Sequence, residues 1–176
     1  AEAGESSAVP QAPKIGINLR RWSYGQAESE RLYALMSQAA KYWLQTCDAS
    51  IAVLPFNVSM QEIKLAEAFV QGLGSECAEV VRYDTSPVEL QRYLGTLDLV
   101  VAMRLHASIM AMNGGTPAIG ISYDPKVGQF YDEMQLPGLC MKLEQATLAG
   151  IVGRAEEVLR QPQQYRDMVL KRLQPL

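Results

Sequence analysis

The sequence predicts an α/β domain built on a doubly wound, Rossmann-like parallel sheet. Short apolar runs alternate with segments of helical period about five times along the chain. The apolar runs are continuous rather than alternating with polar residues, which is typical of parallel strands buried on both faces. The chain has 176 residues, enough for one such domain with a sizeable core but too few for two.

The first half of the chain begins with residues 1–13, which are rich in Ala, Ser, Glu and Pro. We interpret them as a linker or the edge of a fragment, and residues 14–176 as one domain. In the first predicted helix, apolar residues from Leu32 to Cys47 recur at i, i+3, i+4 and i+7, which indicates one buried face. The elements expected here are strands at Lys14–Leu19, Ser50–Phe56 and Glu79–Tyr83, and helices at Gln26–Thr46 and Gln61–Leu73.

The second half opens with a helix start at Ser86. Ser86 is the expected N-cap, Pro87 the first helical residue and Glu89 the reciprocal member of a capping box, with the helix ending near Gly95. The remaining elements expected are strands at Asp98–Met103, Pro117–Ser122 and Leu139–Lys142, and helices at Arg104–Asn113, Lys126–Met134, Glu144–Arg160 and Pro162–Leu173.

Net charge, cysteine content and the length of the apolar runs exclude several kinds of partner and site. The net charge of −3 gives no global attraction to nucleic acid or to an anionic membrane, so we expect neither as a partner. Cys47, Cys77 and Cys140 are widely spaced and odd in number, which argues against a disulfide framework or a zinc site and favours a reducing, cytoplasmic location. We expect no metal, because the sequence shows no cluster of metal-ligating residues. We also expect no membrane span, because no apolar run reaches roughly 18 residues.

Cationic residues follow three strands that the common strand order 3-2-1-4-5-6 would make neighbours. Arg20 and Arg21 follow the first strand, Arg104 the fourth and Lys126 the fifth. Ligands of doubly wound sheets bind beyond the carboxyl ends of such strands. The chain has no glycine-rich phosphate loop, so we expect side chains and helix ends to hold a small phosphate ester and no nucleotide cofactor.

Each candidate residue also has a plain structural interpretation. His106 is the only histidine and lies two residues after Arg104, so it is either a proton donor or a satisfied polar group. Burying Arg104 unpaired between an apolar strand and an apolar helix would be costly, which favours a role for it. Arg20 and Arg21 are adjacent and point different ways, so at most one of them faces the site.

Residues Asp98–Phe130 closely resemble the signature of the polysaccharide pyruvyl transferases. The shared features are an apolar strand followed by Arg-Leu-His, a Gly-x-Pro strand start, and a Tyr-Asp-Pro-Lys-Val segment before an aromatic residue. The segments KIGINLRRW and IAVLPFN are also similar to this family, whose branch acting on bacterial cell-wall polysaccharide is the nearest match. The resemblance implies the C-terminal, donor-binding half of a GT-B-like two-domain enzyme, which transfers pyruvate from phosphoenolpyruvate to a sugar as a ketal.

The resemblance also implies roles for individual residues. Arg104, together with Arg20 or Arg21 and with Lys126, would neutralise the phosphate of phosphoenolpyruvate, and His106 would protonate its methylene carbon. The implied partners are a sugar or lipid-linked saccharide acceptor and an N-terminal domain, without which we expect the chain to be inactive. The family often has an aspartate early in the second helix, where this chain has Gln61-Glu62, and we assign that position no role.

Two alternatives remain open. The first is the nucleotide-sugar-binding half of a GT-B glycosyltransferase, although such enzymes usually place an acidic residue where this chain has Arg104 and His106. The second is a non-catalytic anion-binding module, which would keep the arginines but tolerate the loss of His106.

Overall fold

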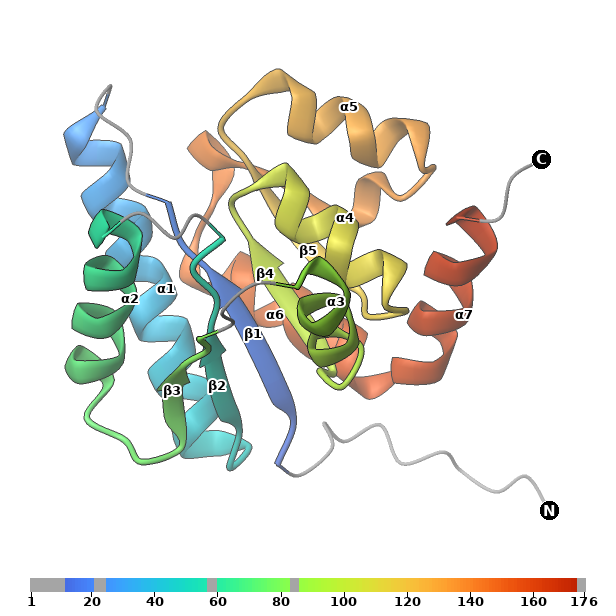
Figure 1. Ribbon diagram of the computed structural model, residues 1–176. Helices are drawn as coiled ribbons and strands as arrows, with labels where there is room; N and C mark the ends of the chain where they lie inside the picture. Colours follow the sequence, from blue (N-terminus) through green and yellow to red (C-terminus); the bar gives the residue numbers. More distant parts are fainter. Residues whose placement is uncertain (1–11, 21–24, 57–59, 83–85, 174–176) are drawn as a thin grey trace, which may run out of the picture.

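The chain folds around a six-stranded parallel sheet, as the computed structural model shows for residues 12–20, 25–56, 60–82 and 86–173 (Figure 1). The strand order is β3-β2-β1-β4-β5-β6, so the predicted order is confirmed. The strands are β1 (Lys14–Asn18), β2 (Ser50–Val53), β3 (Ala78–Val80), β4 (Leu99–Ala102), β5 (Ala118–Ser122) and β6 (Cys140–Lys142). The α-helices are α1 (Gln26–Thr46), α2 (Met60–Leu73), α3 (Pro87–Leu94), α4 (Leu105–Asn113), α5 (Pro125–Glu133), α6 (Leu148–Arg160) and α7 (Pro162–Leu173).

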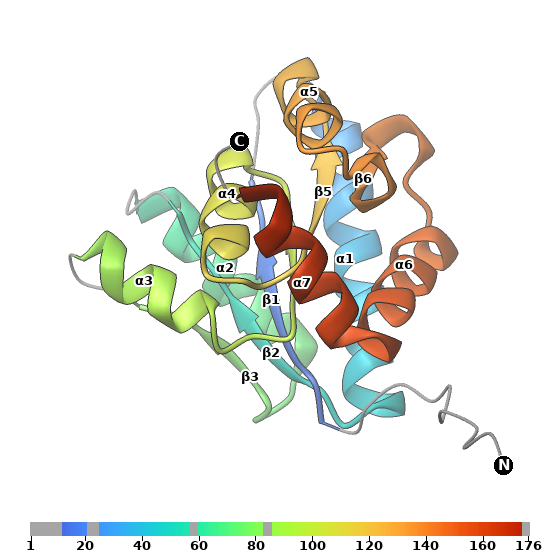
Figure 2. The same ribbon diagram turned by 90° about the vertical axis from the view of Figure 1, so that its right-hand side faces the viewer.

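Helices cover both faces of the sheet. Helix α1 contacts α2 and α6, while α4 contacts α3, α5 and α7. Figure 2 shows α1 and α6 on one side of β1 and β5, with α4 on the other side. The four residues of β4 are all buried, as expected for a central strand covered on both faces. This arrangement confirms the predicted doubly wound, Rossmann-like architecture.

Two predictions about the amino-terminal ends of helices, for α3 and α6, are wrong. Ser86 is the N-cap of α3, but its side chain makes no capping hydrogen bond within the described part of the chain, so the predicted capping box is wrong. Helix α6 begins at Leu148 rather than Glu144, because the Thr147 hydroxyl caps it by accepting a hydrogen bond from the Gly150 amide at 3.0 Å. The residues from Leu143 to Gln145 form a separate 3₁₀ turn.

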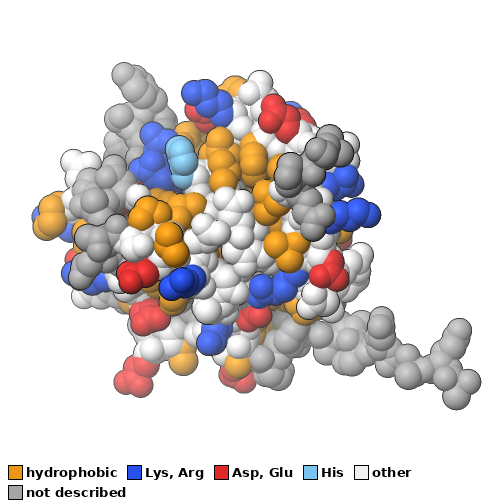
Figure 3. Space-filling view, turned by 45° about the vertical axis from the view of Figure 1, so that its right-hand side comes forward, with side chains coloured by type: hydrophobic (Ala, Val, Ile, Leu, Met, Phe, Trp, Pro, Cys, Tyr) orange, Lys and Arg blue, Asp and Glu red, His pale blue; other side chains and the backbone are white. Residues whose placement is uncertain are grey.

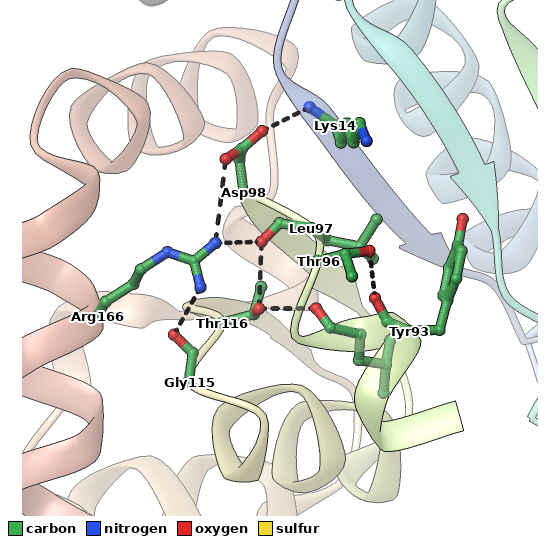
Figure 4. Close-up of polar contacts among 9 residues, drawn as sticks. Lys14, Tyr93, Thr96, Leu97, Asp98, Gly115, Thr116 and Arg166 are labelled. Carbon is green, nitrogen blue, oxygen red and sulfur yellow. Dashed lines mark hydrogen bonds and ion pairs between the residues drawn. The ribbon is translucent and has the colours of Figure 1, made fainter. Parts of the chain in front are cut away.

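The amino ends of β1 and β4 are tied to the last helix by a polar network (Figure 4). Arg166 of α7 donates hydrogen bonds to the carbonyl oxygens of Leu97 at 2.5 Å and Gly115 at 3.4 Å, and one of its nitrogens lies 4.0 Å from the Asp98 carboxylate. Asp98 also accepts a hydrogen bond from the Lys14 amide at 2.8 Å. This network lies at the end of the sheet opposite to the carboxyl ends of the strands.

Strand β5 admits no side chain at Gly120, since the ring of the fully buried Tyr131 packs directly on it. A Cβ atom there would lie 2.4 Å from Cε2 of Tyr131. We therefore expect Gly120→Ala to lower the free energy of unfolding by about 1–3 kcal/mol, as in other overpacked cores. The matched control is Gly72→Ala in α2, where an added Cβ meets nothing within 4 Å and removal of a helical glycine should stabilise by about 0.5–1 kcal/mol. Urea unfolding measures both changes, and equal effects would contradict this account.

Candidate functional site

A cavity of about 810 Å³ lies beyond the carboxyl ends of β1 and β4. These two strands are neighbours at the point where the strand order reverses, which is the usual ligand position in doubly wound folds. The cavity is bounded by the ends of the two strands and by α1 and α2. Its described lining consists of Leu19, Arg20, Ser29, Glu30, Tyr33, Gln61, Glu62, Lys64, Leu65, Ala68, Met103 and Arg104.

Asn18, the last residue of β1, fixes the backbone on which this site is built. Its side chain is fully buried. Its amide nitrogen donates to the Leu54 carbonyl oxygen at 2.8 Å, and its amide oxygen accepts from the Arg104 backbone amide at 3.0 Å. A buried carboxamide must be paired in this way, because leaving it unsatisfied is costly. Asn18 thus links the carboxyl ends of β1, β2 and β4 and holds Arg104 at the N-cap of α4.

The Arg104 side chain points toward α2, where it forms an ion pair with Glu62. The pair is largely removed from water, with side-chain exposures of 23% for Arg104 and 9% for Glu62. Burial lowers the pKa of Arg104 below its usual value, and the positive charge of Arg20 lowers it further. Nε of Arg104 is buried without a hydrogen-bond partner among the described residues. The guanidinium therefore retains donor capacity beyond its contact with Glu62.

Arg20 joins the ends of β1 and β5 across β4. Its guanidinium donates a hydrogen bond to the Tyr123 hydroxyl and lies 5.2 Å from the centroid of the Tyr123 ring, within cation–π range. Its backbone amide lies 3.3 Å from the sulfur of Met103, the residue that precedes Arg104. The predicted convergence of the loops after β1, β4 and β5 is therefore present, and it brings Arg20 and Arg104 to one cavity.

His106 and Lys126 are not among the described residues that line this cavity. His106 lies in the first turn of α4 with an exposed side chain, and Lys126 is exposed in the first turn of α5. In Figure 3 the histidine side chain lies at the surface beside a basic side chain and next to apolar ones. Asp124 is the N-cap of α5, where its side chain accepts a hydrogen bond from the Lys126 amide at 2.9 Å. Arg21 lies outside the described residues.

Three residues of the site were not assigned a role from the sequence. Asn18 is the only polar side chain in the KIGIN strand other than the first residue, and that position was a usable signal. Tyr123 belongs to the Tyr-Asp-Pro-Lys-Val segment, but nothing in the sequence links it to Arg20. Glu62 was left without a role, because its partner lies far away in the chain and the pairing depends on how α2 packs.

The charges of the site favour a small anion. Arg20 and Arg104 supply two cationic groups at one end of the cavity, and Glu62 neutralises one of them in part. Guanidinium groups present several fixed donors and suit phosphate or carboxylate oxygens. Among the described residues, no three His, Cys, Asp or Glu side chains form a group that could hold a metal ion. None of the described helices combines the length and apolar character that a membrane crossing requires.

Comparison with known sequences points to polysaccharide biosynthesis. Residues 7–125 match the family model described as polysaccharide pyruvyl transferase. A curated relative, the amylovoran biosynthesis protein AmsJ of Erwinia amylovora, is 27% identical over 92 residues. The match covers 52% of this chain but only 22% of AmsJ, so the matched segment spans about a fifth of that protein.

Comparison with solved structures supports the fold. The C-terminal domain of a group 1 family glycosyl transferase, LpcC, from Francisella tularensis superposes with a TM-score of 0.58 at 17% identity, covering 97% of this chain and 93% of that domain. A Listeria monocytogenes protein assigned as a UDP-N-acetylglucosamine 2-epimerase gives a TM-score of 0.63 at 14% identity, covering 95% of this chain and 41% of that one. At these identities the likeness shows a shared Rossmann-like fold, of the kind found in glycosyltransferase domains.

Proposed function

Because the chain belongs to the polysaccharide pyruvyl transferase family, we propose that it is the donor-binding half of an enzyme that transfers pyruvate from phosphoenolpyruvate to a sugar as a ketal. The family membership fixes the class of protein, and the donor, the ketal product and the division into halves are part of the proposal. In this proposal a second, N-terminal half completes the site, the acceptor is a sugar or lipid-linked saccharide of the cell wall, and the enzyme works in the cytoplasm.

The observation that carries the proposal is the pair of arginines at the strand-order reversal. Arg20 and Arg104 come from neighbouring strands and line one cavity. Arg104 is held from both sides, through its backbone by Asn18 and through its side chain by Glu62. Such preorganised cations suit a group whose negative charge grows during the reaction, as it does on a departing phosphate.

The proposed chemistry proceeds in three steps. Phosphoenolpyruvate would lie at the edge of the cavity, with its phosphate at Arg104 and its methylene carbon toward the first turn of α4, where the exposed His106 delivers a proton to that carbon. The methylene group becomes a methyl group and leaves a cationic carbon at C2. A sugar hydroxyl attacks C2, and the C2–O bond to phosphate then breaks while Arg20, Arg104 and Lys126 neutralise the departing phosphate. A second hydroxyl attacks C2 and closes the ketal. The two hydroxyls release two protons, of which one restores His106 and the other leaves with phosphate.

Titration of this chain with phosphoenolpyruvate, followed by heat release, tests the donor. We expect saturable binding that Arg20→Ala weakens about tenfold or more, because a hydrogen bond to a charged group contributes about 1.5–3 kcal/mol. The matched control is Arg82→Ala, since Arg82 is also an arginine but pairs with Glu67 and is not among the residues that line the cavity. UDP and nucleotide sugars are titrated in parallel.

The outcomes separate the candidate functions. Preference for UDP or a nucleotide sugar over phosphoenolpyruvate would replace the proposal with a glycosyltransferase half. Equal losses for Arg20→Ala and Arg82→Ala would contradict the assigned site. Because the proposal assigns acceptor binding in part to a second half, the chain alone should turn over no substrate. Robust pyruvyl transfer by the 176-residue chain would refute that division of labour.

A further inference from the structure

The cavity between α1 and α2 is larger than the proposed donor requires. Phosphoenolpyruvate has about ten non-hydrogen atoms, which would fill at most ~300 Å³ if each took the ~30 Å³ share of a water molecule in the liquid. The cavity measures about 810 Å³, so more than half of it remains for a second ligand. We infer that this remaining part, along α1 and α2, binds the sugar acceptor of the reaction; this inference rests on the proposed function.

The polar groups of this wall match a neutral, hydroxylated ligand. Ser29 and Glu30 contribute a hydroxyl and a carboxylate from α1, while Gln61 and Lys64 contribute a carboxamide and an ammonium group from α2. Sugar hydroxyls both donate and accept hydrogen bonds, and these four groups offer donors and acceptors together. One oxygen of Glu30 accepts a hydrogen bond from Gln26 at 2.9 Å, and a carboxylate can accept several more.

The charges along this wall largely offset one another. Glu62 is ion-paired with Arg104, and the carboxylate of Glu30 on α1 is balanced by the ammonium group of Lys64 on α2. An uncharged pyranose can use these groups as hydrogen-bond partners. The side chains of Leu65 and Ala68 supply an apolar strip on α2 beside these polar groups, which suits the C–H faces of a sugar ring.

Tyr33 gives this wall a fixed aromatic side chain. Its ring meets Phe69 edge to face, with centroids 5.3 Å apart and an interplanar angle of 90°. Phe69 is only 1% exposed, so it anchors the Tyr33 ring to the core. Because Arg20 and Arg104 line the same cavity, a sugar on this wall lies next to the proposed donor phosphate. That placement brings an acceptor hydroxyl to C2 of the donor without a large movement.

The test is a titration of this chain with the methyl pyranosides of glucose, galactose and mannose, followed by amide NMR shifts. We expect at least one glycoside to shift the amides of Ser29, Tyr33 and Gln61 in a saturable way. We also expect the glycoside and phosphoenolpyruvate to bind together, each still saturating in the presence of the other. Absence of shifts along α1 and α2 for all three glycosides would overturn the inference, as would displacement of the glycoside by phosphoenolpyruvate.

Two glutamines on the same helix provide a matched pair of variants. Gln61 and Gln71 are both exposed on α2, but only Gln61 lines the cavity. Gln61→Ala should weaken glycoside binding about fivefold, as expected for the loss of one neutral hydrogen bond, whereas Gln71→Ala should leave it unchanged. Equal effects of the two variants would contradict the assigned wall.

Failure of this inference can be told apart from failure of the proposed function. If phosphoenolpyruvate binds and responds to Arg20→Ala but no glycoside binds along α1 and α2, the donor assignment stands and the acceptor subsite falls. If a glycoside binds there but phosphoenolpyruvate does not bind at all, the donor assignment falls, and the cavity is a sugar site of another reaction.

Discussion

Replacement of Arg104 by alanine is expected to weaken phosphoenolpyruvate binding about a hundredfold and to lower the free energy of unfolding by about 3 kcal/mol. The binding loss follows from removal of a preorganised cation that lines the cavity. The stability loss follows because Glu62, only 9% exposed in its side chain, would lose the ion pair with Arg104 that offsets the cost of burying its charge. The stability estimate stays at the low end for a buried pair, since Arg104 itself is 23% exposed.

A double variant separates these two effects. Arg104→Ala combined with Glu62→Gln removes both charges, so most of the lost stability should return while phosphoenolpyruvate binding stays weak. Arg104→Lys keeps the charge but loses the planar donor set, and it should bind the donor with intermediate affinity. Urea unfolding and calorimetric titration of each variant give the two quantities. Restored binding in the double variant would show that Arg104 acts only by supporting the fold.

Replacement of His106 by alanine is expected to lower kcat about 10²–10⁴-fold in the enzyme with its acceptor-side half present, as is typical for loss of a general acid. Phosphoenolpyruvate binding should change much less, because the proposed phosphate ligands Arg20 and Arg104 stay in place. Stability should change by no more than about 0.5 kcal/mol, since the His106 side chain is exposed. Initial rates, donor titration and urea unfolding measure the three effects.

Asn113→Ala serves as the control for His106, since Asn113 is also an exposed polar residue of α4, at its other end. It should leave kcat unchanged. A His106→Ala enzyme with an unchanged rate would show that His106 is not the general acid. A loss of donor affinity as large as the loss in kcat would instead make His106 a phosphate ligand.

The sheet could be predicted from the sequence because its strands are apolar at nearly every position. Continuous apolar runs such as the one at β4 indicate a parallel sheet covered on both faces. The strand order was assumed to be the common one for such sheets, and the structure has that order. Helices α1 and α7 were predicted with both of their ends. The start of α6 was missed, because the competing cap at Thr147 and the 3₁₀ turn before it are decided by local hydrogen bonds.

The candidate site was predictable only in part. The meeting of Arg20 and Arg104 follows from topology, since carboxyl ends of neighbouring parallel strands share one edge of the sheet. The direction of the Arg104 side chain does not follow from topology, because it depends on Glu62 in α2 and on the packing of that helix. The position of His106 outside the cavity lining likewise depends on where it falls around α4.

The Arg166 network has a consequence for where the domain can be cut. The family match ends at residue 125, yet α7 satisfies the carbonyl groups of Leu97 and Gly115 through Arg166, and its Val169 is fully buried. A protein truncated at the end of the match would leave these carbonyls without that donor and would strip β5 of its partner β6. The cooperative unit is therefore longer than the segment by which its relatives are recognised, and its last third supports the strands that carry Arg20 and Arg104 of the proposed site.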